Sequence, residues 1–140
     1  MTTINATDVR RNWSMTLDTV IRERPVYVKR VRDNVVILNQ ATLDLIISPF
    51  KFYSRKYVED DGSITLSTND LDLTVNAEDE SSAKQALARE IKEYAEDFYN
   101  DFALWSSAPN RKDHIPLVLK ALSLSVDLIE KEIVCQNGVN

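Results

Sequence analysis

The sequence has few of the residues that small enzymes rely on. Among its 140 residues are one cysteine, one histidine and two glycines. A glycine-rich phosphate loop needs glycines within a few residues of each other, whereas Gly62 and Gly138 lie far apart. A single cysteine, Cys135, excludes an internal disulfide framework and is typical of the reducing cytoplasm. These absences favour a cytoplasmic binding protein over an enzyme.

Long apolar stretches are also missing. No run approaches the roughly 20 apolar residues that a helix needs to cross a bilayer. The first five residues, Met-Thr-Thr-Ile-Asn, lack the basic and apolar regions of a secretory signal. The sequence therefore predicts a protein without a membrane partner. Its length allows one domain or two small ones.

No catalytic or metal-binding set stands out. A lone histidine at an expected helix start, His114, is more often structural than catalytic. His114 and Cys135 are too few ligands for a zinc site. A carboxylate metal site is conceivable in residues 60–72, but a turn and a polar strand edge explain these acids more simply. They are Asp60, Asp61, Asp70 and Asp72. We therefore expect no catalytic residue, metal, cofactor or small-molecule substrate.

Charge is divided unevenly along the chain. Residues 1–47 hold seven Lys or Arg and five acids, a net of +2, and the remainder holds ten bases and seventeen acids, a net of −7, giving the total of −5. Because an acidic protein repels DNA, any DNA contact must be local and must use the basic N-terminal part. The acidic remainder suits a basic partner, although ordinary surface charge is the simpler alternative.

Residues 4–47 predict the order strand, helix, hairpin and helix. The first helix is expected to begin at Thr7, which can cap free backbone N–H groups, and to stop before Pro25. Residues 26–30 form the next strand, and residues 32–34 form the turn, with Asn34 able to adopt a positive φ. A second helix follows residues 39–42. Helical spacing predicts that the first helix packs through Val9, Trp13, Leu17, Val20 and Ile21.

The return strand of the hairpin is a continuous apolar run. Such a run indicates burial on both faces, which a two-stranded hairpin cannot provide by itself. The sequence therefore predicts a homodimer. Its interface is expected to contain Val35, Val36, Ile37 and Leu38.

This N-terminal segment resembles the Phd/YefM antitoxins. The resemblance rests on Ile4, on the segment Asp8-x-Arg10-x-Asn12, on Pro25-Val26-x-Val28-x-Arg30 and on the apolar return strand. It implies that Arg10 and Arg30 contact DNA. The surrounding basic residues complete the expected DNA-binding set, which is Arg10, Arg11, Lys29, Arg30 and Arg32. The chain departs from the family pattern in carrying Trp13 in place of leucine and Asp33-Asn34 in place of a hairpin glycine.

The pattern changes after Pro49. Strands are expected over residues 50–58, 63–66 and 71–75, with a turn at Asp60-Asp61-Gly62. An amphipathic helix follows from about Ser81 to Trp105, with Asp79 and Ser81 as the candidates for its start, and a last helical region extends from Asp113 to about Ile133. The order of three strands and a long helix is similar to the α+β fold of HicB-type antitoxins.

Two features of this second part have alternative interpretations. The aromatic residues Phe50, Phe52, Tyr53 and Tyr57 could stack single-stranded bases, but sheet packing is the simpler explanation. The leucine-rich C-terminal helical region is equally consistent with a partner-binding face and with core.

These observations predict an α+β protein with a Phd/YefM-like β-α-β-β-α dimerisation and DNA-binding domain over residues 1–48. An antiparallel sheet packed with helices, over residues 49–140, would bind a toxin. The predicted function is that of a type II antitoxin that neutralises a cognate toxin and represses its operon through operator DNA. The alternative is a cytoplasmic dimeric interaction module that does not bind DNA.

Overall fold

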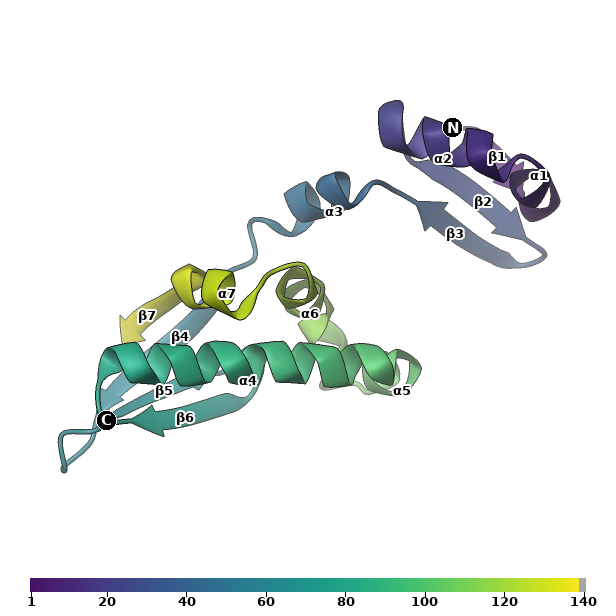
Figure 1. Ribbon diagram of the computed structural model, residues 1–140. Helices are drawn as coiled ribbons and strands as arrows, with labels where there is room; N and C mark the ends of the chain where they lie inside the picture. Colours follow the sequence, from purple (N-terminus) through teal and green to yellow (C-terminus); the bar gives the residue numbers. More distant parts are fainter. Residues whose placement is uncertain (139–140) are drawn as a thin grey trace. The chain divides into compact units, whose positions relative to one another are not determined.

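The computed structural model describes residues 1–138 and is an α+β structure with two mixed sheets packed with helices (Figure 1). The chain divides into two compact units, which we call unit 1 (Met1–Ile46) and unit 2 (from Ile47 onward). Within the described residues, no helix is both long and apolar enough to span a membrane.

Unit 1 is a three-stranded sheet with its first two helices packed on one face, followed by a third helix whose last residue, Ile47, is the first residue of unit 2. Its elements are β1 (Thr3–Asn5), α1 (Ala6–Arg11), α2 (Trp13–Arg22), β2 (Val26–Arg30), β3 (Asp33–Ile37) and α3 (Gln40–Ile47). The central strand, β2, pairs parallel with β1 and antiparallel with β3. Burial alternates along β2, so that Val26 and Val28 form a small core with Val9 and Val20 of the helices.

The first helix differs from its prediction in three respects. Its N-cap is Asn5, whose side-chain oxygen accepts from the backbone N–H of Thr7 at 2.8 Å, so Thr7 lies inside the helix. The helix is interrupted at Asn12 (φ −115°, ψ 41°). The interruption rotates α2, which leaves Trp13 49% exposed and Ile21 61% exposed instead of facing inward.

The hairpin turn also lies earlier than predicted. Arg30 pairs with Asp33, so Val31 and Arg32 form a two-residue connection, and Val31 adopts the left-handed φ of +54°. Asn34, expected to take a positive φ, is an ordinary residue of β3. A β-branched residue rarely adopts this conformation, so Val31 is strained.

Unit 2 is a four-stranded sheet with order β6-β5-β4-β7 and a helical layer. The strands are β4 (Phe52–Val58), β5 (Ile64–Thr68), β6 (Leu73–Ala77) and β7 (Ile133–Asn137). The helices are α4 (Glu80–Asn100), α5 (Phe102–Ser107), a 3₁₀ turn η1 (Lys112–His114), α6 (Ile115–Leu122) and α7 (Val126–Glu132). The predicted three-strand meander and long helix are therefore present.

Local signals set several boundaries of unit 2 as expected. Gly62 has a φ of +84° in the turn between β4 and β5, where its N–H donates to the Glu59 carbonyl at 2.9 Å. Asp79 caps α4 by accepting from the N–H of Ser82 at 2.7 Å. The inward face of α4 packs into the core. The helix ends at Asn100, however, and residues 102–107 form the separate helix α5.

The C-terminal strand was not predicted. The last helical region ends at Glu132, and the chain continues as β7, which pairs parallel with β4 from Phe52↔Ile133 to Lys56↔Asn137. The expected antiparallel pairing holds for β4, β5 and β6, and β7 adds a parallel pair that makes the sheet mixed. Ile133 is buried and Val134 is exposed, which is the alternation of a half-buried strand.

Candidate nucleic-acid interface and partner surfaces

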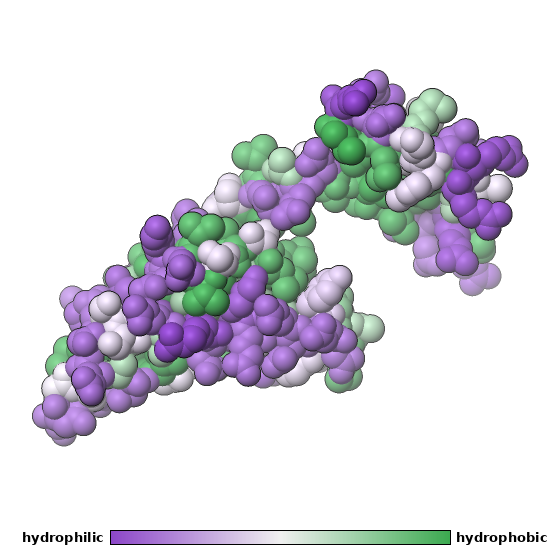
Figure 2. All heavy atoms as spheres, viewed as in Figure 1, coloured by the Kyte–Doolittle hydropathy of each residue, from purple (hydrophilic) through white to green (hydrophobic). Residues whose placement is uncertain are grey.

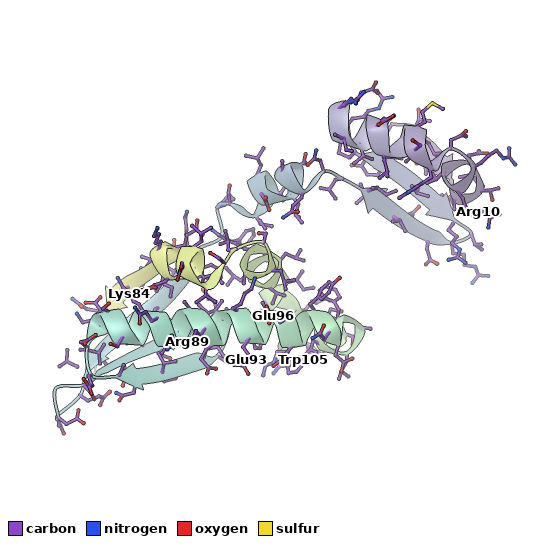
Figure 3. All side chains as sticks on the ribbon, viewed as in Figure 1. Arg10, Lys84, Arg89, Glu93, Glu96 and Trp105 are labelled. Atoms are coloured by element: carbon purple, nitrogen blue, oxygen red, sulfur yellow. The ribbon has the colours of Figure 1, made fainter. Side chains whose placement is uncertain are left out.

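Three of the five predicted DNA-binding residues line one surface hollow of unit 1, which we call the basic hollow. Arg10 comes from α1, and Lys29 and Arg30 come from the end of β2. The remaining lining residues are Asn5, Ala6, Thr7 and Val31. Figure 3 places Arg10 at the hairpin end of this unit.

The local fold explains why these residues meet. Asn5 ends β1 opposite Lys29 of β2, and its side chain caps α1 immediately afterwards. Arg10 therefore emerges about one turn into α1, close to where β2 ends. The hairpin turn at Val31 closes the hollow on its other side.

All five predicted DNA-binding side chains are exposed, and none forms an ion pair or hydrogen bond with another residue among those described. Arg30 pairs with Asp33 in the β register without forming a salt bridge. Arg11 and Arg32 do not line the basic hollow. Since no acid of the described chain neutralises these cations, their charge is available to an anionic ligand.

The predicted dimer residues lie at or next to an unpaired sheet edge. β3 has a partner strand on one side alone, so its other backbone edge is open within the described residues. Val35 is 50% exposed and Val36 is 44% exposed, whereas Ile37 and Leu38 are half-buried. The single chain therefore does not bury the return strand on both faces.

Exposed apolar side chains occur on both faces of this sheet. Val36 pairs with Tyr27 on the face opposite the core, where Tyr27 is 43% exposed. Trp13 and Ile21 of α2 add exposed apolar area that the sequence pattern assigned to the core. Figure 2 shows hydrophobic side chains gathered on the visible face of unit 1 beside α2. Such uncovered area is typical of interaction surfaces.

In unit 2, three polar side chains form a hydrogen-bonded chain that ends at the single histidine. Arg111 Nη1 donates to the Tyr94 hydroxyl at 3.1 Å, and that hydroxyl lies 2.6 Å from His114 Nδ1. The tautomer of the imidazole decides which of these two atoms donates the proton in the hydrogen bond between Tyr94 and His114. Burial, and then the Arg111 charge, lower the pKa of His114, which keeps the ring neutral.

His114 is therefore not the exposed helix-start residue that the sequence suggested. It is 5% exposed, and Asp113, its neighbour in η1, does not cap α6. The carboxylates of Asp72, Asp113 and Asp70 oppose the lowering of its pKa. The described residues contain no group of three or more His, Cys, Asp or Glu side chains arranged to hold a metal ion.

A buried lysine holds the first residues of unit 2 in place. Lys120 of α6, 5% exposed, donates to the carbonyls of Ser48 at 3.3 Å and Phe50 at 2.6 Å. It also forms a 2.8 Å ion pair with Glu132. Its ammonium lies 5.7 Å from the centre of the Phe52 ring, which is buried in the core and unavailable for base stacking.

Comparison with known proteins identifies the family. A PHD-like family model, described as the antitoxin of a RelE/RelB toxin–antitoxin system, matches residues 1–135. The chain belongs to this antitoxin family. A crystal structure from Syntrophomonas wolfei subsp. wolfei, described as the antitoxin part of a proposed toxin/antitoxin system, has a TM-score of 0.92 and 37% identity. The match covers 99% of this chain and 100% of that one. No curated protein matches.

The antitoxin assignment confirms the main sequence-based identification. The Phd/YefM likeness of residues 1–47 and the HicB likeness of residues 50–105 stay predictions. Sequence reasoning missed the exposed apolar residues of α2 in this antitoxin, because uninterrupted helical spacing assigned them to the core. A polar residue at position 12, Asn12, was the available signal for a helix break.

Proposed function

We propose that this antitoxin forms a homodimer through unit 1, binds its own operator DNA there, and neutralises its toxin by direct binding through unit 2. The division follows the predicted boundary between residues 1–48 and 49–140. The protein would act in the cytoplasm and without catalysis. The observation that carries the DNA-binding part is the basic hollow, where Arg10, Lys29 and Arg30 converge without an acidic partner in the described chain.

Dimerisation would raise the affinity of this basic surface for DNA. A single hollow offers few phosphate contacts, and a two-fold pair doubles them and matches a palindromic operator. The open edge of β3, with Val35 and Val36, and the exposed Trp13 and Ile21 of α2 are the surfaces that a second copy would cover. Toxin binding would then alter how many dimers are tethered together, and with it the avidity for DNA.

An operon reporter tests repression in cells. The promoter upstream of the gene is fused to a reporter, and the wild-type antitoxin is compared with an Arg10→Ala/Arg30→Ala variant. Repression should be lost in the double variant. Arg24→Ala is the matched control, because Arg24 is exposed and lies outside the basic hollow. If Arg24→Ala loses repression to the same extent as the double variant, the basic hollow is not the DNA-binding surface.

Co-expression with the adjacent open reading frame tests neutralisation. The full chain and a fragment beginning at Ile47 should both restore growth and capture the toxin, whereas a fragment of residues 1–46 should do neither. The fragment begins at Ile47 because this residue is buried and Lys120 binds the next carbonyls. If the full chain captures the toxin and the fragment that begins at Ile47 does not, the assignment of toxin binding to unit 2 is wrong.

The alternative function is a dimeric interaction module without DNA binding. The exposed apolar surfaces of unit 1 favour it as much as they favour the repressor. A dimer in solution that does not shift operator DNA would support this alternative.

A further inference from the structure

The tip of the β2–β3 hairpin in unit 1 carries an exposed apolar side chain on a strained backbone (Figure 1). Val31 and Arg32 form its two-residue turn. Val31 is 85% exposed, more than any other large apolar residue of the described chain apart from Met1. Its φ is +54°, in the left-handed region. Exposure and strain are independent observations, and both occur at this one residue.

The positive φ makes valine a costly choice at the first turn position. Arg32, the second turn residue, does not share the positive φ. In a two-residue hairpin of this kind, the first turn residue is usually glycine. A β-branched side chain resists the conformation, whereas glycine and asparagine adopt it readily. Backbone strain that the surrounding structure maintains concentrates at sites that bind ligands.

The exposed valine lies among cations. Arg30 and Arg32 flank it in the chain, and Arg10 of α1 lines the basic hollow together with Val31. None of these arginines forms an ion pair in the described chain. Asp33 is the one acid of the hairpin, and it forms no salt bridge with Arg30. A second copy of the chain at this tip would bring like charges together, so a polyanion is the favoured partner.

Duplex DNA provides a partner for the charges and for the apolar side chain. Its phosphates match the arginines on either side of the tip. The major groove admits a two-stranded ribbon, and the C5-methyl group of thymine is the apolar group that the base edges present there. The minor groove presents no such group. An apolar side chain between two phosphate-bound arginines therefore fits against a thymine methyl group.

We propose that Val31 enters the major groove of the operator and contacts the methyl group of a thymine, while Arg30 and Arg32 bind the phosphates on either side. This proposal rests on the proposed function, because it requires unit 1 to bind operator DNA. It adds a residue that reads sequence to a surface whose charges alone would bind any sequence. In the two-fold dimer, two hairpin tips would read one thymine in each half-site.

Removing either partner of this contact tests it. Val31→Gly removes the side chain and Val31→Asn makes it polar, and both new residues tolerate the positive φ, so both full-length variants should fold and dimerise. Circular dichroism and analytical ultracentrifugation check this. The DNA upstream of the gene is synthesised with thymidine or with deoxyuridine, which lacks the methyl group and keeps the base-pairing groups. Gel-shift titrations then measure every combination of protein and DNA at one salt concentration.

The effects of the two changes should not add. On thymidine DNA, each Val31 variant should bind about tenfold more weakly than wild type, because the dimer loses two apolar contacts. On deoxyuridine DNA, the wild type and the variants should bind with nearly equal affinity. The matched control is Val58→Asn, at a 59% exposed valine of unit 2, which should bind both DNAs like wild type.

The other outcomes contradict the proposal in different ways. If the Val31 variants bind thymidine DNA as tightly as wild type does, the tip contacts no base, although the protein remains a repressor. If they weaken binding by the same factor on both DNAs, Val31 does not read a methyl group. If they dissociate the dimer, Val31 belongs to the dimer interface. If wild type does not bind the upstream DNA, the proposed function fails and this inference fails with it.

Discussion

Unit 1 and unit 2 differ in how completely each buries its own apolar surface. The core of unit 1 consists of four valines, whereas the described core of unit 2 contains fifteen buried residues, including Phe52 and Phe98. Unit 1 also leaves Trp13, Ile21 and Val35 about half exposed or more. A unit of fewer than 50 residues with so small a core has little stability by itself.

This difference indicates how each unit works. Unit 2 has the core of an independent domain and can present a preformed surface to a partner. We expect unit 1 to complete its core only when a second copy covers the open β3 edge and α2. Folding, dimerisation and DNA binding of unit 1 are then a single linked equilibrium.

The largest effect is expected from a charge at the proposed dimer interface. Val36→Asp should dissociate the dimer and unfold unit 1, because a buried, unpaired carboxylate costs several kcal/mol. Unit 2 should keep its melting transition. Analytical ultracentrifugation and calorimetry measure the two effects.

A control and a second variant sharpen this test. Leu104→Asp, at a 65% exposed residue of α5, should change neither the dimerisation of the protein nor the folding of unit 1. Ile21→Asp tests the α2 surface separately from the sheet surface. A Val36→Asp protein that remains dimeric, with unit 1 folded, would show that unit 1 does not depend on this face.

The converse variant removes a large side chain from the core of unit 2. Phe98 is fully buried, with a relative exposure of 0%. Phe98→Ala should destabilise unit 2 by about 3–5 kcal/mol. Denaturant unfolding should record this loss while operator binding by unit 1 is retained. Parallel loss of DNA binding would mean that the two units fold cooperatively.

A smaller and opposite effect is expected at the hairpin of unit 1. Asparagine tolerates the left-handed φ of Val31 better than a β-branched residue does. Val31→Asn should therefore stabilise unit 1 by roughly 1 kcal/mol. Val35→Asn, in the ordinary extended conformation of β3, should not. Thermal melting of both variants checks the prediction, and a lower melting temperature for Val31→Asn would contradict it.

The smallest effect concerns the pH dependence of unit 2. Because the pKa of folded His114 is lowered from 6.5, protonation favours the unfolded chain. The stability that neutral His114 contributes is complete above about pH 6.5 and declines as the pH falls, by at most about 1.4 kcal/mol per pH unit. His114→Gln should flatten the slope between pH 7 and pH 5. An unchanged slope in denaturant titrations would contradict the neutral, Tyr94-bound histidine.

Local patterns predicted most of the elements but not all of their ends. Pro25 ended a helix, Asp79 began one and Gly62 formed a turn, because capping and turn chemistry act between residues close in sequence. The same local rules placed the hairpin turn too late. Register with β2 fixed the turn at Val31, against the preference for Asn34.

Features that depend on distant residues could not be predicted. Residues 133–137 pair with β4, about 80 positions earlier, and an apolar segment of this kind suits either a helix or a strand. His114 is buried because Tyr94, twenty residues away, binds its ring. The basic residues of the DNA-binding set were found from their resemblance to a family, whereas their convergence in one hollow depends on the pairing of β1 with β2.

The most direct test of the account is the salt dependence of operator binding. Gel-shift titrations on the DNA upstream of the gene, at two salt concentrations, compare wild type, Arg10→Ala/Arg30→Ala and the control Arg24→Ala. If both arginines contact phosphates, each contact should contribute roughly one unit to the slope of log binding constant against log salt concentration. The dimer carries two copies of each arginine and therefore doubles this contribution. We predict weaker binding and a flatter slope for the double variant alone, with the dimer intact. Unchanged affinity of a dimeric double variant would contradict the assignment of the basic hollow to DNA.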